Sequence, residues 1–185
     1  ISGNFDRMSS NYDGIVKLMP KVLGERLPNE LARLGKFELN GAMDLTYEDI
    51  DADIEITSKL GYLKSDIYID KLYDIDRASY NGNIILNKFD LGTLIDDKIV
   101  GKATLNLDVN GKGFTQKYLD TKLNGTVDEL YFNEYNYSKI DIDGTLKMPY
   151  FKGNINSNDK NLKMDFDGVV DLSAKSKNFL SCVQL

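Results

Sequence analysis

Apolar and polar residues alternate with a period of two along most of the chain, and this pattern constrains the fold more than any other feature. In the segment 50–57 every even position is Ile or Ala, and every odd position is Asp, Glu or Thr. The segment 103–110 repeats the pattern with Ala, Leu and Val at its odd positions. Strict alternation is typical of antiparallel strands that bury one face only. We therefore predict an all-β chain of nine or ten long strands.

One region near the N-terminus departs from this pattern. Between Asn11 and Leu34 the apolar residues recur at spacings of three and four, which is the periodicity of a helix. Pro20 and Pro28 divide this region into short pieces, and Gly35 is a typical stop signal. A second short helical turn is predicted at 90–95.

These patterns give a simple organisation along the chain. We expect residues 1–185 to form a single segment of a longer elongated β-protein, with a short helical insertion at 11–35 and a curved β-sheet over 36–185. The chain begins at Ile1 rather than Met, and residues 179–185 have the composition of a strand that is cut off partway. We interpret both ends as parts of a longer chain.

Glycines that follow Asn or Asp carry the next signal. Asn40-Gly41 and similar pairs are typical of the two central positions of a tight hairpin. In such a hairpin the apolar phase flips across the turn, yet Leu39, Gly41 and Met43 share one parity. We therefore predict that the strand continues through the glycine and bends there, although a three-residue loop would also preserve the phase. Apolar-x-Gly-x-apolar units recur as a loose internal repeat at Gly41, Gly82, Gly125, Gly144, Gly153 and Gly168.

A sheet with one apolar face and little helix must have that face covered. A closed barrel or sandwich, an oligomer, or a trough that holds an apolar ligand would each satisfy this requirement. The predicted inner face is aliphatic, contains no charged residue, and includes Tyr80 as the one tyrosine of eleven that we assign to it. Such a lining suits acyl chains. The residues that we predict to line this groove are Leu39, Met43, Ile54, Ile67, Ile84, Leu105, Leu107, Val109, Val127, Ile142, Leu146, Met164 and Phe166.

Composition excludes several classes of function. The chain contains no His, so catalytic triads with His and His-ligated metal sites cannot form. It has 29 acidic and 23 basic residues, a net charge of −6, and no cluster of Lys and Arg along the sequence, so we expect no nucleic-acid partner. Cys182 has no second Cys with which to form an intramolecular disulfide, and we interpret it as a small buried apolar residue. No apolar run approaches the roughly 20 residues that a membrane-spanning helix needs.

Pairs of aspartates before glycine resemble fragments of calcium loops. Asp141 and Asp143 precede Gly144 with Ile142 between them, and Asp165 and Asp167 flank Phe166 in the same way. The apolar residue between each pair and the absence of a following twelve-residue loop favour an exposed strand face instead. Because the acids lie almost wholly at outward positions, we expect no catalytic residue, no metal site, no cofactor and no enzymatic activity.

Several stretches resemble TamB and the wider AsmA-like family, in a Bacteroidetes-type version. They are FDLGTL at 89–94, VGKATLNLDVNGKGF at 100–114, LDTKLNG at 119–125, IDIDGTL at 140–146 and MDFDG at 164–168, with a helix-to-strand step LPNELARLGKFELNG at 27–41. The resemblance spans nearly the whole chain and rests on the alternation pattern and on glycine placement.

The resemblance implies both a fold and a function. Proteins of this family carry a long curved sheet with an apolar groove, called a β-taco, and extend through the periplasm from an inner-membrane anchor. They are implicated in moving phospholipid to the outer membrane and, with an Omp85-type partner, in outer-membrane protein assembly. For this chain we expect a periplasmic length of groove that contacts phospholipid acyl chains, with the Omp85-type protein bound by other parts of the full-length chain. The alternative is a structural or adhesive closed β-sandwich with no role in lipid binding.

Overall fold

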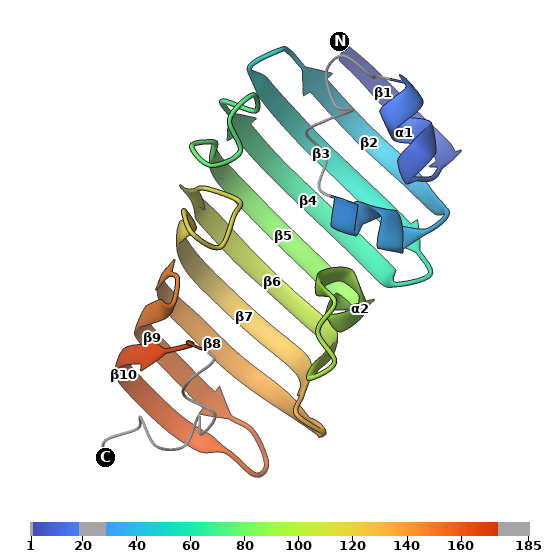
Figure 1. Cartoon of the computed structure of the whole chain (residues 1–185). Helices are drawn as coiled ribbons and strands as arrows, with labels where there is room; N and C mark the ends of the chain where they lie inside the picture. Colours follow the sequence, from blue (N-terminus) through green and yellow to red (C-terminus); the bar gives the residue numbers. More distant parts are fainter. Residues whose placement is uncertain (1, 19–28, 174–185) are drawn as a thin grey trace.

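The computed structural model describes residues 2–18 and 29–173, and they form one antiparallel sheet of ten strands with three short helical segments (Figure 1). Each strand pairs with its neighbours in the sequence, so the strand order is β1 to β10. The strands are β1 (Ser2–Ser10), β2 (Phe37–Leu45), β3 (Asp49–Ser58), β4 (Gly61–Asp70), β5 (Ser79–Asp90), β6 (Val100–Lys112), β7 (Asp120–Phe132), β8 (Tyr135–Lys147), β9 (Tyr150–Asn158) and β10 (Lys163–Asp171). The prediction of an all-β antiparallel chain is confirmed.

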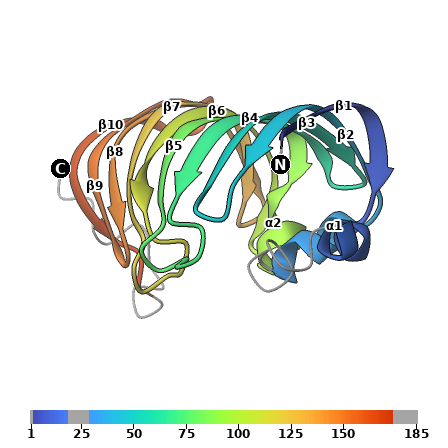
Figure 2. The same ribbon diagram turned by 90° about the horizontal axis from the view of Figure 1, so that it is seen from above.

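The sheet is open and strongly curved. β1 and β10 are its two edge strands, and they do not pair with each other. Seen from above, the ten strands form an arch with a concave and a convex side (Figure 2). A trough-like sheet is therefore the architecture that the described residues adopt, and a closed sandwich is not.

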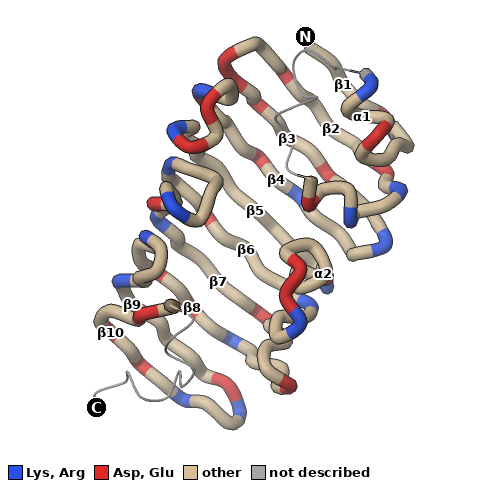
Figure 3. Tube along the Cα trace, viewed as in Figure 1, with Lys and Arg blue, Asp and Glu red and all other residues tan. Residues whose placement is uncertain are grey.

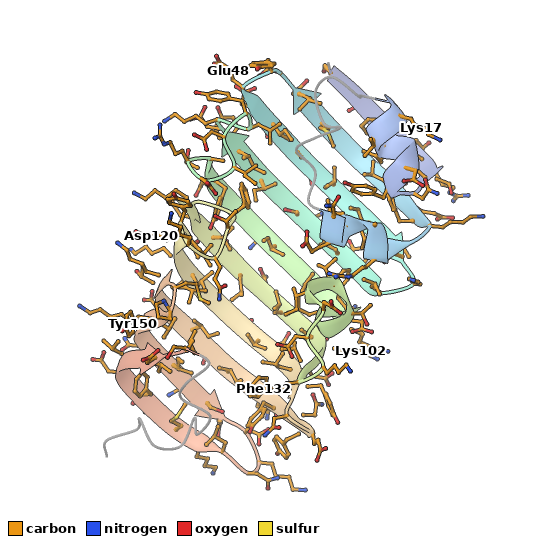
Figure 4. The ribbon with its side chains drawn as sticks, viewed as in Figure 1. Lys17, Glu48, Lys102, Asp120, Phe132 and Tyr150 are labelled. Carbon is orange, nitrogen blue, oxygen red and sulfur yellow. The ribbon has the colours of Figure 1, made fainter. Side chains whose placement is uncertain are left out.

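The turns between strands alternate between two rims of the trough. The loop rim carries the connections 46–48, 71–78, 113–119 and 148–149, and the helical rim carries 11–36, 59–60, 91–99, 133–134 and 159–162. In Figure 4, Asp120 and Tyr150 lie along the loop rim, whereas Lys102 and Phe132 lie toward the helical rim. These two names are used below for the two long margins of the sheet.

The glycines of the Asx-Gly pairs lie inside strands, as the parity argument predicts. Gly41 lies in β2, Gly125 in β7, Gly144 in β8 and Gly168 in β10, and none of them occupies a hairpin turn. At Gly41, Gly125 and Gly144 a backbone oxygen of the neighbouring strand comes very close, whereas the atoms nearest Gly168 belong to Phe166 of the same strand. A Cβ atom at Gly41 would overlap the carbonyl oxygen of Asp53 on β3. Glycine therefore permits a close approach of adjacent backbones at the first three of these positions.

Three helical segments lie on the concave side of the sheet (Figure 2). They are α1 (Tyr12–Leu18), the 3₁₀ helix η1 (Asn29–Leu34) and α2 (Leu91–Ile95). Gly35 ends η1 with a φ of 70°, and the Asp90 carboxylate accepts a hydrogen bond from the Thr93 amide at the start of α2. The short helices predicted around residues 11–34 and 90–95 are confirmed within the described residues, while Pro20 and Pro28 lie outside them.

The helical segments bury one half of the concave face. Their side chains pack into a cluster centred on the buried residues Leu34, Phe37, Leu39, Leu60, Leu86 and Phe89. Arg33 joins η1 to α2, because its Nη1 donates to the Leu94 carbonyl at 2.7 Å and its Nη2 lies 3.3 Å from Oδ2 of Asp96. The described members of this cluster come from β1 to β6 and the helical segments, and none comes from β7 to β10.

The sheet also includes β1, which pairs with β2 and precedes the helical insertion in the sequence. The predicted terminal strand at 179–185 and Cys182 lie outside the described residues. No helix among the described residues is long and apolar enough to cross a membrane.

Candidate functional site

The predicted groove residues all lie on one face of the sheet. Strand pairing places residues of the same face in rows that run from strand to strand, along the axis of the trough. The central row consists of Gly41, Ile54, Ser65, Ile84, Leu107, Gly125, Ile142, Ile155 and Phe166, and Phe5 of β1 pairs with Gly41. The row next to it toward the helical rim consists of Leu39, Ile56, Leu63, Leu86, Leu105, Val127, Ile140, Ser157 and Met164.

The remaining predicted residues belong to two further rows of the same face. Met43, Ile67 and Val109 lie in the row next to the central one on the side of the loop rim, and Leu146 lies in the row beyond it. This face is the concave one, because Leu39, Ile54, Ile84 and Leu105 pack against the helical cluster. All thirteen predicted residues therefore share the concave face.

Helical cover divides this face into two halves. Over β1 to β6 the helical cluster leaves residues such as Leu39 and Leu86 buried. Central-row side chains are partly buried in both halves, as at Ile54 and Ile142, but no described helical segment packs on those over β7 to β10. Half-buried aliphatic and aromatic side chains in a continuous row are the feature of this half that most resembles a binding surface for an apolar ligand.

The concave face also contains hydroxyl side chains that the sequence analysis did not assign to it. Ser65, Thr121 and Ser157 are buried there. Each hydroxyl donates to a backbone carbonyl: Ser65 to Asn83 at 3.2 Å, Thr121 to Lys122 at 3.3 Å and Ser157 to Leu162 at 3.1 Å. Each of these hydroxyl protons is engaged in a hydrogen bond within the sheet, so the three hydroxyl groups do not offer free donors to a ligand on the concave face.

Several inward residues were missed because the strands contain bulges. Leu86 and Phe89 are three residues apart yet lie on the same face, with a register shift between them. Val127 and Leu130 show the same three-residue step on β7, so Tyr137, which pairs with Leu130, also faces inward. A bulge inserts one residue and reverses the parity beyond it, which is why Tyr80 is not the only tyrosine on this face.

Aromatic side chains lie at both rims of the concave face. Tyr80 is buried near the loop rim, and its ring centroid is 4.8 Å from that of Phe114. Burial raises the pKa of the Tyr80 hydroxyl, so this group stays neutral in the physiological range. Tyr135 and Tyr137 form an edge-to-face pair at the helical rim with 4.7 Å between their centroids. Aromatic rings with polar hydroxyl groups thus lie at both margins of the concave face.

The convex face carries the polar partners of the Asx-Gly pairs. Asn83 Nδ2 donates to Oδ1 of Asp108 and to Oδ1 of Asn106, both at 2.8 Å, which shows how amides bridge neighbouring strands there. The row that contains Asn83 and Asp108 is made of acids and amides on eight successive strands: Asp53, Asp66, Asn83, Asp108, Asn124, Asp143, Asn154 and Asp167. The Asp or Asn of each pair faces outward while the adjacent glycine faces inward.

The aspartate pairs that resemble calcium loops belong to this exposed face. Asp141, Asp143, Asp165 and Asp167 are all exposed on strands β8 and β10. Within the described ranges, no group of three or more acidic or Cys side chains is placed to hold a metal ion. A shallow pocket on this face is lined mainly by Asn124, Thr126, Asp141, Asp143, Asn154 and Asn156.

Asp159 is the one buried carboxylate of this region, and it fastens the turn between β9 and β10 to β8. It accepts hydrogen bonds from the Asn161 amide at 2.8 Å, the Tyr135 hydroxyl at 2.7 Å, and the amide and hydroxyl of Ser138 at 3.1 and 2.7 Å. These donors, the Asn161 amide first and then the Tyr135 hydroxyl, hold the pKa of Asp159 well below its usual range. The ionised form is therefore the one that stabilises the hairpin.

We expect Asp159→Asn to loosen this hairpin. An amide presents an NH₂ group where Ser138 now donates to a carboxylate oxygen, so at least one donor loses its acceptor. Amide hydrogen exchange in Lys163–Asp171 should become faster. Asp167→Asn, on the exposed face of the same hairpin, is the matched control and should leave exchange unchanged. Equal protection in both variants would contradict this assignment.

The sign of the pH dependence follows from the direction of the shift. The folded-state pKa of Asp159 lies below that of the unfolded chain, so the stabilisation is complete at pH values above the ordinary aspartate pKa of about 4. It is lost as the pH falls below that value toward the lower folded-state pKa. The hairpin of Asp159→Asn should lack this part of the acid dependence.

Comparisons of the chain with protein-family models, curated proteins and solved structures found no match. The case for a function therefore depends on the residues and on the geometry of the concave face.

Proposed function

We propose that this chain is a segment of an AsmA-like envelope-biogenesis protein whose concave face binds phospholipid acyl chains and conducts phospholipid between the inner and outer membranes. The observation that carries the proposal is the continuous row of inward residues from β2 to β10, which is apolar apart from Ser65, is partly exposed, and has no described helical cover over β7 to β10. A partly exposed apolar strip of this kind is favourable for a hydrocarbon chain and unfavourable for water.

The dimensions of the row support an acyl ligand. Neighbouring strands are about 4.8 Å apart, so the part of the row from Gly125 on β7 to Phe166 on β10 is about 14 Å long. One leaflet of the hydrocarbon core of a bilayer is about 15 Å thick. The half of the face without described helical cover can thus contact an acyl chain over a length close to the thickness of one leaflet.

The chemistry of the lining supports the same ligand. Ile142, Ile155 and Phe166 offer contact without directional hydrogen bonds, and the nearby hydroxyl of Ser157 already donates to a backbone carbonyl. Ligands with many polar groups would lose hydrogen bonds to water without replacement on such a surface. Acyl chains lose none, which favours them over sugars or peptides.

The cellular setting is part of the same proposal. A periplasmic location, an inner-membrane anchor elsewhere in the full-length protein, and support of outer-membrane protein assembly through an Omp85-type partner are all inferred from the family resemblance. The glycines on which the resemblance partly rests lie inside strands of the curved sheet.

Site-specific photo-crosslinking in living cells tests the proposal. A photoreactive residue at Ile142 or Met164, on the concave face of the half without helical cover, should capture phospholipid that mass spectrometry can identify. The same residue at Asp141 or Asp165, one position away on the convex face, should capture none. Absence of lipid at both inward positions in folded protein would refute the proposal and leave a structural or adhesive role.

A further inference from the structure

The fold brings together five lysines that are separated in the sequence. The stretches 110–122 and 144–154 contain five lysines and a single acid, Asp120. Pairing of β6 to β9 places Lys112 opposite Asp120 and Asp120 opposite Lys147, while Lys122 and Lys152 both lie opposite Thr145. The fifth, Lys117, lies in the adjoining connection 113–119. The sequence contains no contiguous cluster of Lys and Arg, and strand pairing is what brings these five lysines together.

This basic patch, consisting of Lys112, Lys117, Lys122, Lys147 and Lys152, lies along the loop rim over β6 to β9. Figure 3 shows the positive residues along this margin of the sheet. All five lysines are exposed, and Lys147 forms an ion pair with Asp120, at 3.3 Å between Nζ and Oδ2. The patch thus has a net positive charge in a chain whose net charge is −6.

Exposed aromatic side chains accompany the lysines. Tyr118 is 43% exposed, and Tyr150 is 51% exposed at the start of β9. Lys117 Nζ lies 4.8 Å from the centre of the Tyr118 ring. Tyrosine beside lysine is the combination found at membrane surfaces, where the ring enters the headgroup region and the ammonium group meets phosphate.

We infer that this rim binds an anionic phospholipid surface. Five lysines supply attraction to the negative headgroups, and Tyr118 and Tyr150 supply rings that enter the interface. A nucleic acid fits the patch less well. Asp108 and Asp143 lie on the same convex face one row farther from the rim, so they repel a polyanion that extends along this face, whereas a membrane that contacts only the rim stays clear of them.

The basic patch also lies close to the margin of the concave face. Lys122, Lys147 and Lys152 lie on β7, β8 and β9, which have no helical cover among the described residues, so a membrane bound at this rim would lie beside the loop-rim end of the uncovered concave face. The inference does not require the concave face to carry lipid, and a surface-binding measurement can succeed or fail independently of the crosslinking experiment.

Sedimentation with lipid vesicles tests the inference. The 185-residue chain should bind vesicles of equal parts phosphatidylglycerol and phosphatidylcholine, and should not bind phosphatidylcholine alone. The combined substitution Lys117→Gln, Lys122→Gln and Lys152→Gln should weaken binding about 100-fold, since each lysine near an anionic surface contributes roughly fivefold. High salt should weaken the binding of the unchanged chain in the same direction.

The matched control changes three exposed lysines of the opposite rim, Lys36→Gln, Lys98→Gln and Lys160→Gln. This variant has the same net charge as the first, and its binding should be almost unchanged. Equal losses in the two variants would show attraction by overall charge and would overturn the inference. So would strong binding to phosphatidylcholine alone, or oligonucleotide binding that exceeds vesicle binding and depends on the same three lysines.

Discussion

Phe89→Ala should lower the free energy of unfolding by about 4 kcal/mol, the loss typical of a large side chain removed from a packed core. Phe89 is fully buried, at 0% exposure. It packs in the cluster that joins the sheet to η1 through Leu34 and to the β3–β4 turn through Leu60. Loss of the ring leaves a cavity where the helical segments meet the concave face. Equilibrium unfolding in urea, monitored by circular dichroism, measures the effect.

Phe114→Ala is the matched control. This phenylalanine lies at the loop rim, is 43% exposed, and has one described ring contact, with Tyr80. Its loss should cost about 1 kcal/mol, the order of an aromatic pair contact. Similar losses in the two variants would show that the helical cluster is not the main core of the molecule.

The inward position of Phe89 could not be predicted from the alternation of apolar and polar residues. Alternation assigns inward residues correctly as long as a strand is regular, and it predicts the rows through Ile54, Ile84 and Ile142. Phe89 lies beyond a bulge at which Lys88 adopts a φ of 49°, so the parity counted from Leu86 places it on the wrong face. Nothing in the local sequence marks that bulge, because neither Asn87 nor Lys88 is a glycine.

Glycine placement predicts the course of the strands more reliably than alternation alone, because the apolar phase on the two sides of each glycine shows whether a hairpin turn is present. A hairpin at Asn40-Gly41 would have reversed the apolar phase, and the sequence shows no reversal. The structure places Gly41 inside β2, opposite Ile54. The same reasoning explains why Asn and Asp precede these glycines: the polar residue faces outward at the bend.

Features that depend on the register between neighbouring strands could not be predicted from the sequence. The hydroxyl of Ser65 has a backbone acceptor only because β4 lies beside β5. The basic patch forms only because β6 to β9 align Lys112 and Lys122 with Lys147 and Lys152. The net charge of the chain is negative and does not reveal these lysines as a group. The register of β6 to β9 brings them together into a local positive surface.

The helical insertion gives the trough two unlike halves, and this asymmetry bears on the proposed lipid path. Ile15 of α1 packs against the main cluster and also against a smaller one built on Leu45 and Leu72 near the loop rim. α1 therefore crosses the concave face at the β1 and β2 end. An acyl chain on the central row would meet this helix if it moved toward β1, whereas no such element lies over β7 to β10 among the described residues.

Gly41→Ala should destabilise the protein by about 4 kcal/mol, through two effects of similar size. Gly41 has a φ of 122°, a conformation that L residues avoid at a cost of about 1–3 kcal/mol. Its new Cβ atom would overlap the Asp53 carbonyl oxygen and lie 2.9 Å from the Ile54 Cα, so the backbone of β3 would have to move. Overpacking of this kind costs a further 1–3 kcal/mol or so. Urea unfolding measures the sum.

Gly3→Ala separates the loss of a glycine from the loss of this bend. Gly3 lies on β1 and faces the same side of the sheet, but the nearest atom to an added Cβ is Cζ of Phe5 at 3.6 Å, an ordinary contact. That variant should unfold at nearly the same urea concentration as the unchanged chain. If Gly41→Ala behaves in the same way, β2 tolerates a side chain at its bend, and the curvature of the sheet there does not depend on glycine. If only Gly41→Ala is destabilised, the close approach of β2 and β3 is what requires the glycine, and the Asx-Gly pairs mark where the strands bend.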